Sequence, residues 1–322
     1  MQSIDNIFQA LDHVANRTIT VFGDYCLDKY MYIDPARDEE SVETGLTAYQ
    51  VERKILYPGA GGTITNNLRS LGANVQCVGL VGNDGEGYDL LKCLAQIGAD
   101  TELMVQSENT PTNTYMKPMR GNTDGTYSEM NRLDIRHFSE TSKELEARLL
   151  ENLRRALETS QGVVIIEQFL QRNCSAVTDC IRDELAELAL RFPEKFFLAD
   201  SRGFADSYRN VIIKCNQFEL SDTIENLAAV NRAVVVTAGE KGALVYEGGT
   251  TAHIPAFPVE GPLDIVGAGD ATNAGTMLGL TLGLTLPESV LLGGSVSSIT
   301  IQQIGVTGTA TIEQVKQRLR SY

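Results

Sequence analysis

Gly267-Ala268-Gly269-Asp270 lies between a predicted strand and a Gly- and Ala-rich stretch that is predicted as a helix. Small residues in tandem let backbone N–H groups converge on one point, and a helix that starts there adds the positive end of its dipole. Such donors stabilise the charge on a transferring phosphoryl group, and a carboxylate beside them can take a proton from an attacking hydroxyl. The stretch therefore fits a small-molecule kinase as well as it fits a tight turn capped by Asp270.

Around this stretch, short apolar runs alternate with helical patterns. Helical periodicity covers residues 142–159 and 176–192, and the apolar runs cover 18–23, 162–167, 196–200, 211–216 and 233–237. Buried strands that alternate with helices are typical of a doubly wound, mostly parallel sheet with helices on both faces. The sequence predicts an α/β fold of this class, as a single domain over residues 1–322.

Each predicted strand ends at a polar residue, and these ends are Asp24, Glu167, Asp200, Asn216 and Thr237. Ligands of open α/β sheets bind outside the carboxyl ends of the strands, so the five side chains predict a site at one edge of the sheet. A plainer reason stays open for about half of them, because strands also stop at polar residues where connecting loops reach the surface.

Two stretches, at about 30–58 and 112–134, interrupt the alternation. Both are rich in β-forming residues, and turn signals lie at Gly121-Asn122 and Asp124-Gly125. We expect them to form a small β lid over the site. A sheet this small leaves an apolar face exposed to water, for which the candidates are Val51, Ile55, Tyr115 and Met116. Two copies that pack lid to lid would cover this face, so we expect a homodimer.

Charge and composition limit the partners of the chain. The 322 residues carry a net charge of −15, which disfavours binding to nucleic acid or to an anionic membrane. No apolar run reaches the roughly 18 residues of a membrane span, and the first residues lack the apolar core of a secretory signal. The 6 Cys and 3 His show no zinc spacing. We expect a cytoplasmic protein without a transition-metal site.

Two commoner functions of glycine-rich segments do not fit this sequence. The first predicted strand is followed by Gly23-Asp-Tyr-Cys-Leu-Asp28, which lacks the G-x-G-x-x-G of a dinucleotide-binding turn, and the chain contains no Gly-Lys dipeptide for a P-loop. Four blocks in order instead resemble the ribokinase-like (PfkB-type) carbohydrate kinases, over nearly the whole chain. The blocks are Val21-Phe-Gly-Asp24 with Leu27-Asp28-Lys-Tyr30; Pro58-Gly-Ala-Gly-Gly-Thr-Ile-Thr-Asn-Asn67 with the segments to Gly79 and Gly85; Asn216-Gln-Phe-Glu219 with Thr237-Ala-Gly-Glu-Lys-Gly242; and Asp264-Ile-Val-Gly-Ala-Gly-Asp270. The first block looks closest to the heptose-phosphate kinase branch.

The resemblance implies a role for each matching residue in an ATP- and Mg²⁺-dependent transfer to a sugar hydroxyl. Asp270 would be the general base, and the amides of Gly267, Ala268 and Gly269 would hold the phosphoryl group. The nucleotide and its Mg²⁺ would be bound by Asn216, Glu219, Thr237, Gly239 and Gly242, with Asp264 near a monovalent-cation site. The sugar would be bound by Asp24, Asp28, Gly59, Gly61, Thr63 and Asn67.

Three of these residues also fit a purely structural role. Asn-x-x-Glu is the capping-box pattern as well, so Asn216 and Glu219 can cap a helix, either instead of serving a metal or in addition to it. Asp28 fits a solvated loop carboxylate nearly as well as a sugar ligand.

The chain also departs from the family pattern. Thr63 stands where the glycine-rich motif has an asparagine, and Ile265-Val266 replaces a pair of threonines. Glu167-Gln-Phe-Leu-Gln171 lacks the lysine of the heptose branch, and Arg172 is a candidate replacement. These losses favour, as an alternative, a catalytically weak sugar- or nucleotide-binding protein on the same fold. An NAD enzyme has only the α/β pattern in its favour.

Overall fold

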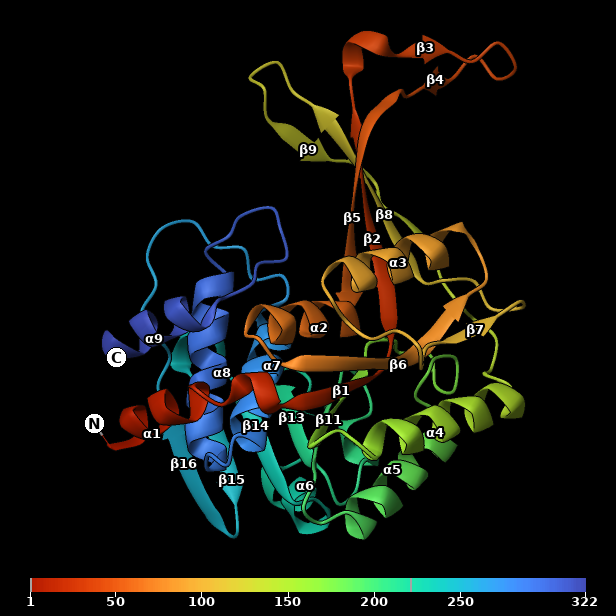
Figure 1. The fold of residues 1–322 in the computed structure, drawn as a ribbon. Helices are drawn as coiled ribbons and strands as arrows, with labels where there is room; N and C mark the ends of the chain where they lie inside the picture. Colours follow the sequence, from red (N-terminus) through yellow and green to blue (C-terminus); the bar gives the residue numbers. More distant parts are fainter. Residues whose placement is uncertain (1, 221) are drawn as a thin grey trace.

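The computed structural model describes residues 2–220 and 222–322. Its centre is a nine-stranded sheet in the order β16-β15-β14-β13-β12-β11-β1-β6-β7, parallel from β14 to β7 and antiparallel at β15 and β16 (Figure 1). The strands are β1 (Thr18–Gly23), β6 (Asn74–Gly82), β7 (Val105–Ser107), β11 (Gly162–Glu167), β12 (Phe196–Ser201), β13 (Ile212–Asn216), β14 (Ala233–Thr237), β15 (Ala243–Glu247) and β16 (Thr250–Ile254). Three of the five predicted strands have the predicted bounds, and the other two differ by one residue.

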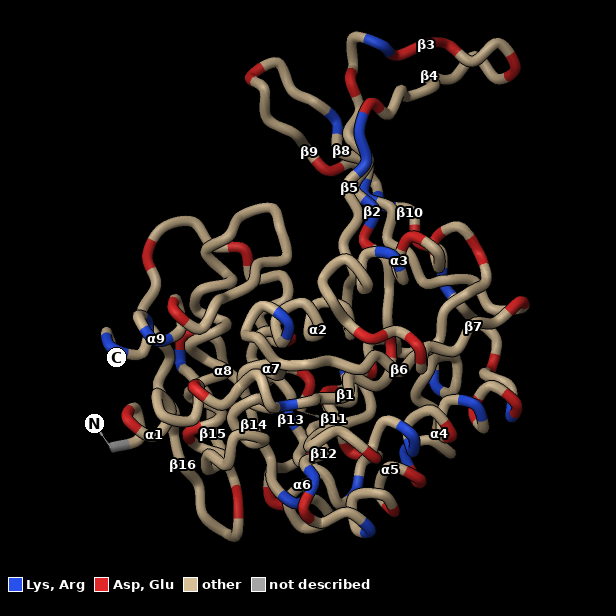
Figure 2. Tube along the Cα trace, viewed as in Figure 1, with Lys and Arg blue, Asp and Glu red and all other residues tan. Residues whose placement is uncertain are grey.

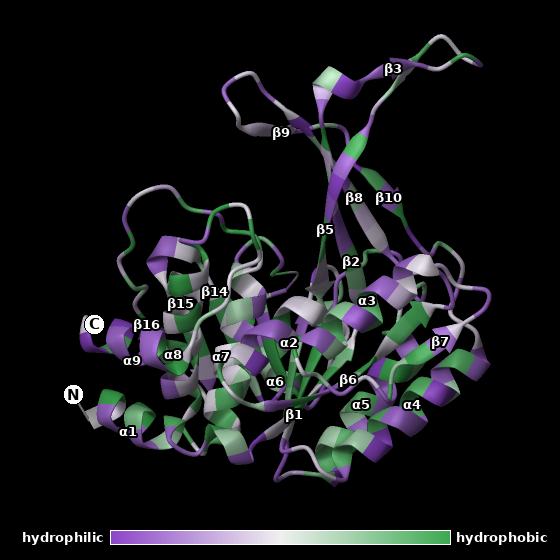
Figure 3. Cartoon of the chain, turned by 45° about the horizontal axis from the view of Figure 1, so that its top comes forward, coloured by the Kyte–Doolittle hydropathy of each residue, from purple (hydrophilic) through white to green (hydrophobic). Residues whose placement is uncertain are grey.

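Helices cover both faces of this sheet, as the strand–helix alternation predicted. One face carries α1 (Gln2–Leu11), α2 (Gly61–Ser70), α7 (Ala268–Thr281), α8 (Leu286–Thr300) and α9 (Ile312–Arg320), and the other carries α4 (Lys143–Leu157), α5 (Asp179–Arg191) and α6 (Ile224–Val230). Hydrophobic residues dominate the strands of this sheet, whereas hydrophobic and hydrophilic residues alternate along the outer helices α4 and α5 (Figure 3). Among the described residues, no helix has the length and apolar character needed to cross a membrane.

The prediction of a strand directly before Gly267 is wrong. β16 ends at Ile254, and the chain runs through loops and turns until α7 begins at Ala268. Ile265 and Val266, which resemble strand residues in the sequence, are 74% and 59% exposed. Without a neighbouring strand to pair with, a short β-forming run stays a loop.

A second sheet stands out from the main body (Figure 1). It has the order β10-β8-β2-β5, with β9 paired to β8. Its strands are β2 (Tyr25–Ile33), β5 (Val51–Ala60), β8 (Thr114–Gly121), β9 (Tyr127–Glu129) and β10 (Leu133–Ile135), and a short β3–β4 hairpin (Glu39–Glu40 and Thr47–Ala48) extends it. The two stretches predicted to leave the main fold therefore pair with each other, although β2 begins earlier than expected. α3 (Gly85–Gln96) packs against this sheet.

The four residues predicted for the exposed apolar face do not share one face. Successive residues of a strand point to opposite faces, and Tyr115 and Met116 are neighbours in β8. Met116 is aligned with Lys29, whose side chain pairs with Glu86 of α3 at 3.1 Å. The face turned away from α3 instead carries Asp28, Tyr30, Tyr32, Arg53, Ile55, Tyr57, Tyr115, Lys117 and Met119. We call it the tyrosine face.

A single residue joins the two sheets at the start of the chain. β1 ends at Gly23 and β2 begins at Tyr25, so only Asp24 lies between them. The N–H of Asp24 donates to the carbonyl of Ile166 in β11 at 2.9 Å, and its carbonyl accepts from the N–H of Gly61 at the start of α2. This junction therefore lies where β1, β2 and α2 meet.

Candidate functional site

Polar side chains lie together at the carboxyl edge of the main sheet. β14, β13, β12, β11 and β1 are consecutive neighbours and parallel. Their carboxyl ends therefore bring the five predicted strand-end residues to one edge: Thr237, Asn216, Asp200, Glu167 and Asp24.

The Gly267–Asp270 turn reaches this edge at the start of α7. Gly267 is left-handed, with φ 80°, and precedes the first helical residue. The N–H of Ala268 donates to the carbonyl of Ile265 at 3.1 Å, whereas the N–H groups of Gly267 and Gly269 have no acceptor among the described residues. The amides at the two glycines are thus available to an anion, at the positive end of the helix.

Thr63 lies against the same turn. A Cβ atom on Gly267 would come within 3.2 Å of the Thr63 methyl group and 3.0 Å of the Thr307 methyl group. Asn67, one turn further along α2, donates to the carbonyls of Thr63 and Gly308, and its buried Oδ1 has no partner among the described residues. The glycine-rich segment and the Gly267–Asp270 turn therefore meet in space.

Asp270 is partly buried beside several charged groups. Burial, together with the negative charge of Asp200, raises the pKa of its carboxyl to about 7, against the opposing charges of Lys214 and Arg202. A carboxyl that titrates near neutral pH can accept a proton and release it again. Such a group suits general acid–base chemistry.

Lys214 and Asp200 form a buried ion pair under the turn. Lys214 is 4% exposed, and its ammonium group donates to Asp200 Oδ2 at 2.7 Å. Asn273 of α7 donates to the same oxygen at 2.6 Å. Although burial lowers the pKa of Lys214, the carboxylate of Asp200 has the stronger net effect and holds it above its usual value. Sequence reasoning missed Lys214, although a lysine inside the apolar run of β13 was a usable signal.

Asp24 is 3% exposed, and its carboxylate faces backbone N–H groups. Oδ2 accepts from Gln168 at 2.8 Å and from Phe169 at 3.3 Å, and Oδ1 accepts from Ala176 at 3.1 Å. Burial raises the pKa of Asp24 to about 7 in spite of these donors. The carboxylate is thus anchored to the loop that follows β11.

Asp28 faces Lys117 across the second sheet. The two charged groups are 2.9 Å apart, and Lys117 also donates to the hydroxyl of Tyr30. A Cβ atom on Gly59 would lie 2.7 Å from Asp28 Oδ2, so glycine leaves the room that this carboxylate occupies. A Cβ atom on Gly61 would likewise meet the ring of Tyr25 and the carbonyl of Asp24. Asp28 is therefore a paired carboxylate rather than a solvated one.

Asn216 and Glu219 make the reciprocal hydrogen bonds of a capping box. Asn216 Oδ1 accepts from the N–H groups of Phe218 and Glu219, and Glu219 Oε2 accepts from the N–H of Asn216 at 2.9 Å. No helix begins at this turn, because α6 starts at Ile224 behind its own cap, Thr223. The interpretation of this pair as a helix cap is therefore wrong.

The loops that follow β14 and precede α7 complete this edge. Thr237 ends β14, and a tight turn through Gly239 returns the chain at Gly242, whose carbonyl accepts from the N–H of Ala238 at 2.8 Å. Asp264 joins two other loops, since its carboxylate accepts from the N–H groups of Val266 and Gly305. Among the described residues, no three His, Cys, Asp or Glu side chains gather as a metal cluster.

Arginines gather near the second sheet. Burial raises the pKa of Tyr115 to about 12, against the nearby charges of Arg136, Arg132 and Arg202. Arg202 is exposed and pairs with no acidic side chain in the described part of the chain. Arg172, which the sequence suggested as a replacement for the missing lysine, is instead bound to Asp179 at 2.9 Å.

Glu167 reaches the carboxyl edge but points into the protein. Its carboxylate accepts from Arg182 at 2.5 Å, from Ser201 at 2.8 Å and from the hydroxyl of Tyr208 at 2.9 Å. Glu167 and Arg182 are each 2% exposed. This residue therefore belongs to a buried polar network that ties β11 to α5 and β12.

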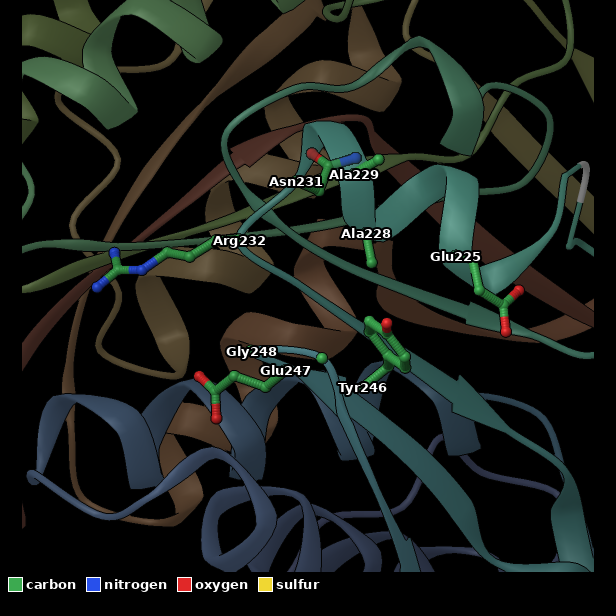
Figure 4. A pocket seen from close by; sticks show the side chains of 9 residues that line it. Glu225, Ala228, Ala229, Asn231, Arg232, Tyr246, Glu247 and Gly248 are labelled. Atoms are coloured by element: carbon green, nitrogen blue, oxygen red, sulfur yellow. The ribbon is translucent and has the colours of Figure 1, made fainter.

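A hollow lies at the opposite edge of the sheet. Its volume is about 390 Å³, and α6 and the β15–β16 hairpin enclose it (Figure 4). The side chains that face it include Glu225, Arg232, Tyr246 and Glu247. Because Arg232 precedes β14 while Thr237 ends it, the hollow is separated from the candidate site by the length of the strand.

The class of protein follows from a match to a known family. The sequence profile of the pfkB family carbohydrate kinases matches residues 24–313. The chain belongs to the PfkB family.

Relatives and solved structures agree with this assignment. The chain is 25% identical over 323 residues to the "Bifunctional protein HldE" of Bradyrhizobium diazoefficiens, and the match covers 93% of the chain but 62% of that relative. The HldE of Psychromonas ingrahamii is 26% identical, with 92% and 62% covered. Two solved structures share the fold at 18% identity, each covering 94% of this chain and 98% of its own. They are the tetrameric inhibited form of phosphofructokinase-2 from Escherichia coli, with a TM-score of 0.71, and Arabidopsis thaliana ribokinase complexed with ribose and ATP, with a TM-score of 0.65.

Proposed function

We propose that the protein transfers a phosphoryl group from ATP to a hydroxyl of a sugar or sugar derivative, with Asp270 as general base. The observation that carries this proposal is the position of Asp270, partly buried in the first turn of α7 with its pKa raised to about 7. Near neutral pH such a carboxylate is partly ionised, so it can accept the hydroxyl proton as the new P–O bond forms.

The amides of the turn stabilise the transferring group. Gly267 and Gly269 supply N–H donors that have no acceptor in the described part of the chain, and Ala268 adds a third if its bond to Ile265 is exchanged for a phosphoryl oxygen. The nucleotide lies along Thr237, Gly239 and Gly242, at the neighbouring strand end.

Mg²⁺ is held near Asn216 and Glu219. Their oxygen atoms are the hard ligands that this ion prefers, and Glu219 Oε1 has no hydrogen-bond partner among the described residues. The ion supplies charge neutralisation at the nucleotide phosphates, directly or through its water molecules. Asp264 lies beside the position proposed for a monovalent cation.

The sugar lies between the two sheets, with the second sheet as a lid. Asp24 and Asp28 provide carboxylates, and Thr63 and Asn67 line the side next to Gly267, where Gly59 and Gly61 leave space. Arg202 and Arg136 lie near Tyr115 on the lid and favour an acceptor that carries an anionic group. Together with the resemblance to the heptose-phosphate branch, this charge favours a heptose phosphate.

The test is an ADP-release screen over free and phosphorylated sugars, heptoses included. The expected substrate is a phosphorylated sugar, with Asp270→Asn as the inactive control. Arg202→Gln should raise the KM of that substrate about tenfold, the value of one charge-assisted contact, and leave the KM of an unphosphorylated analogue unchanged. The assay is run above pH 8, where Asp270 is ionised in both proteins. Absence of ADP release with every sugar would favour the binding protein instead.

Glu219→Gln is expected to raise the Mg²⁺ concentration at half-maximal rate about tenfold. The glutamine keeps an oxygen that can accept from the N–H of Asn216, so the turn survives and only the charge is lost. A Mg²⁺ titration of the initial rate measures the effect, and a circular dichroism melt verifies the fold. An unchanged titration would restrict Asn216 and Glu219 to shaping the turn.

We also propose that the protein is a homodimer through the tyrosine face. The far part of the second sheet stands clear of the main body, and its stem carries a group of Lys and Arg residues (Figures 1 and 2). Two aromatic contacts order this sheet, Tyr30 with Tyr57 and Tyr32 with Tyr127. A partner's tyrosine face would cover Ile55 and Met119 in a two-fold contact.

Light scattering at micromolar concentration is therefore expected to report twice the mass of the chain. Ile55→Glu should give the mass of one chain, because it places a charge on the tyrosine face. Met116→Glu is the matched control, since Met116 points to the opposite face and the variant should stay dimeric. A monomeric wild type, or equal behaviour of the two variants, contradicts this interface.

A further inference from the structure

None of the roles proposed so far accounts for the hydrogen bond between Asp200 and Asn273 of α7. Asp200 is 7% exposed at the end of β12. Its Oδ2 accepts from the ammonium group of Lys214 at 2.7 Å and from the side-chain amide of Asn273 at 2.6 Å. One carboxylate oxygen thus connects two neighbouring strands of the sheet to a helix that follows some 70 residues later in the sequence.

The ion pair of Asp200 and Lys214 also lies against the turn proposed to bind the phosphoryl group. A Cβ atom on Gly269 would lie 3.0 Å from the Lys214 ammonium nitrogen, so this group is packed directly against the turn. Asn273 lies three residues after Asp270, on the same side of α7. Any loosening of Asp200 would therefore free both the cation under Gly269 and the helix that carries Asp270.

We propose that Asp200 is a positioning residue for phosphoryl transfer, which holds Lys214 against Gly269 and Asn273 against β12 and so fixes the first turn of α7 over the strand ends. The proposal rests on the proposed role of Asp270 as the base. A buried carboxylate with two buried donors is a costly arrangement for packing alone, because apolar side chains of similar volume would be at least as stable.

The charges around Asp270 make the role of Asp200 measurable. Asp200 raises the pKa of Asp270, as Asp28 of β2 does, while Lys214 of β13 and Arg202, after β12, lower it. Cys26 of β2 also lies near Asp270. Because ionised Asp270 is the active form, kcat/KM falls as the pH drops below the pKa of this group. Removal of the Asp200 charge lowers that pKa, so the acidic limb of the profile should move to lower pH.

The central experiment compares Asp200→Asn with the wild type. We expect kcat to fall about 10- to 100-fold, as for a small displacement of the reacting groups, while the KM of the sugar changes little. The acidic limb of kcat/KM should move down by about one pH unit. The loss of kcat should persist at pH 9, where Asp270 is ionised in both proteins. Wild-type kcat together with an unshifted limb would overturn the proposal.

Two further variants separate positioning from stability. Asp200→Asn leaves Lys214 buried without its counter-ion, so its Tm should fall, and Lys214→Met in the same chain should recover the Tm but not kcat. Glu167→Gln is the matched control, because it also removes a carboxylate from a buried ion pair at a strand end. It should lower the Tm and leave the acidic limb in place. If Glu167→Gln shifts the limb equally, or if the double variant regains full kcat, the role of Asp200 is structural only.

Asp270→Asn in the same series distinguishes failure of the positioning proposal for Asp200 from failure of the proposed function. Near-native turnover of Asp270→Asn would remove the base and the positioning proposal with it. An inactive Asp270→Asn beside a fully active Asp200→Asn would remove the positioning proposal alone.

Discussion

Asp270→Asn is expected to lower turnover by about 10²–10⁴-fold, the usual contribution of a general base. Asparagine keeps the shape of the side chain but cannot accept the hydroxyl proton. The site proposed for the nucleotide lies elsewhere, at the ends of β13 and β14, so nucleotide affinity should barely change. Steady-state ADP release together with a nucleotide titration measures both quantities.

The wild-type pH profile supplies the control for this prediction. Because burial raises the pKa of Asp270 to about 7, kcat/KM should fall about tenfold per pH unit well below pH 7. The residual kcat of Asp270→Asn, measured at saturating sugar so that titration of Asp24 in the free enzyme does not contribute, should lack this acidic limb. A variant that keeps near-native turnover and the same limb would leave Asp270 without a catalytic role, and the side chain of Asp270 does not cap α7 either, because the N-cap is Gly267 and no side chain caps it.

Arg182→Met is expected to reduce the free energy of unfolding by about 3–5 kcal/mol. The substitution leaves the Glu167 carboxylate buried without its cation, with only the hydroxyls of Ser201 and Tyr208 as donors among the described residues. Burial already raises the pKa of Glu167, and loss of Arg182 raises it further. Urea unfolding of wild type and variant measures the difference.

The direction in which stability changes with pH tests whether the unpaired Glu167 charge causes the loss of stability in Arg182→Met. An acid whose pKa is higher in the folded state binds more protons there, so its folded state loses stability as the pH rises. The deficit of Arg182→Met should therefore be smaller at pH 5 than at pH 8. The double variant Glu167→Gln/Arg182→Met has no charged side chain at either of these two buried positions and should recover part of the loss. Equal deficits in the single and double variants would contradict the unpaired charge as the cause.

The main sheet could be predicted because its strands are short, apolar and closed by polar residues. A parallel sheet that is covered on both faces buries its strands, so apolar residues are expected along their whole length. The run from Val21 to Gly23 has no polar side chain, for example. The start of α8 is equally local, since Thr285 and Glu288 form a capping box with the Thr-x-x-Glu spacing that the sequence shows. Local chemistry was sufficient for these elements.

What could not be predicted depends on contacts between distant residues. Lys214 is one residue in a strand, and only the fold brings it under Gly269. The pairing of Arg172 with Asp179 depends on how α5 packs. Because of this pairing, Arg202 rather than Arg172 is the candidate cation for a substrate anion. The error over Tyr115 and Met116 was different, since strand periodicity alone could have prevented it.

The junction at Asp24 makes the two sheets mechanically dependent on each other. The carboxylate of Asp24 is anchored to the main body by backbone donors, while Asp28, four residues later, is anchored to Lys117 in the second sheet. In the proposed function, a sugar that contacts both carboxylates would bridge this junction. Its binding energy would favour those arrangements of the two sheets that allow both contacts. Sugar affinity and the population of these arrangements would therefore be linked, so that a substitution at the junction should change both.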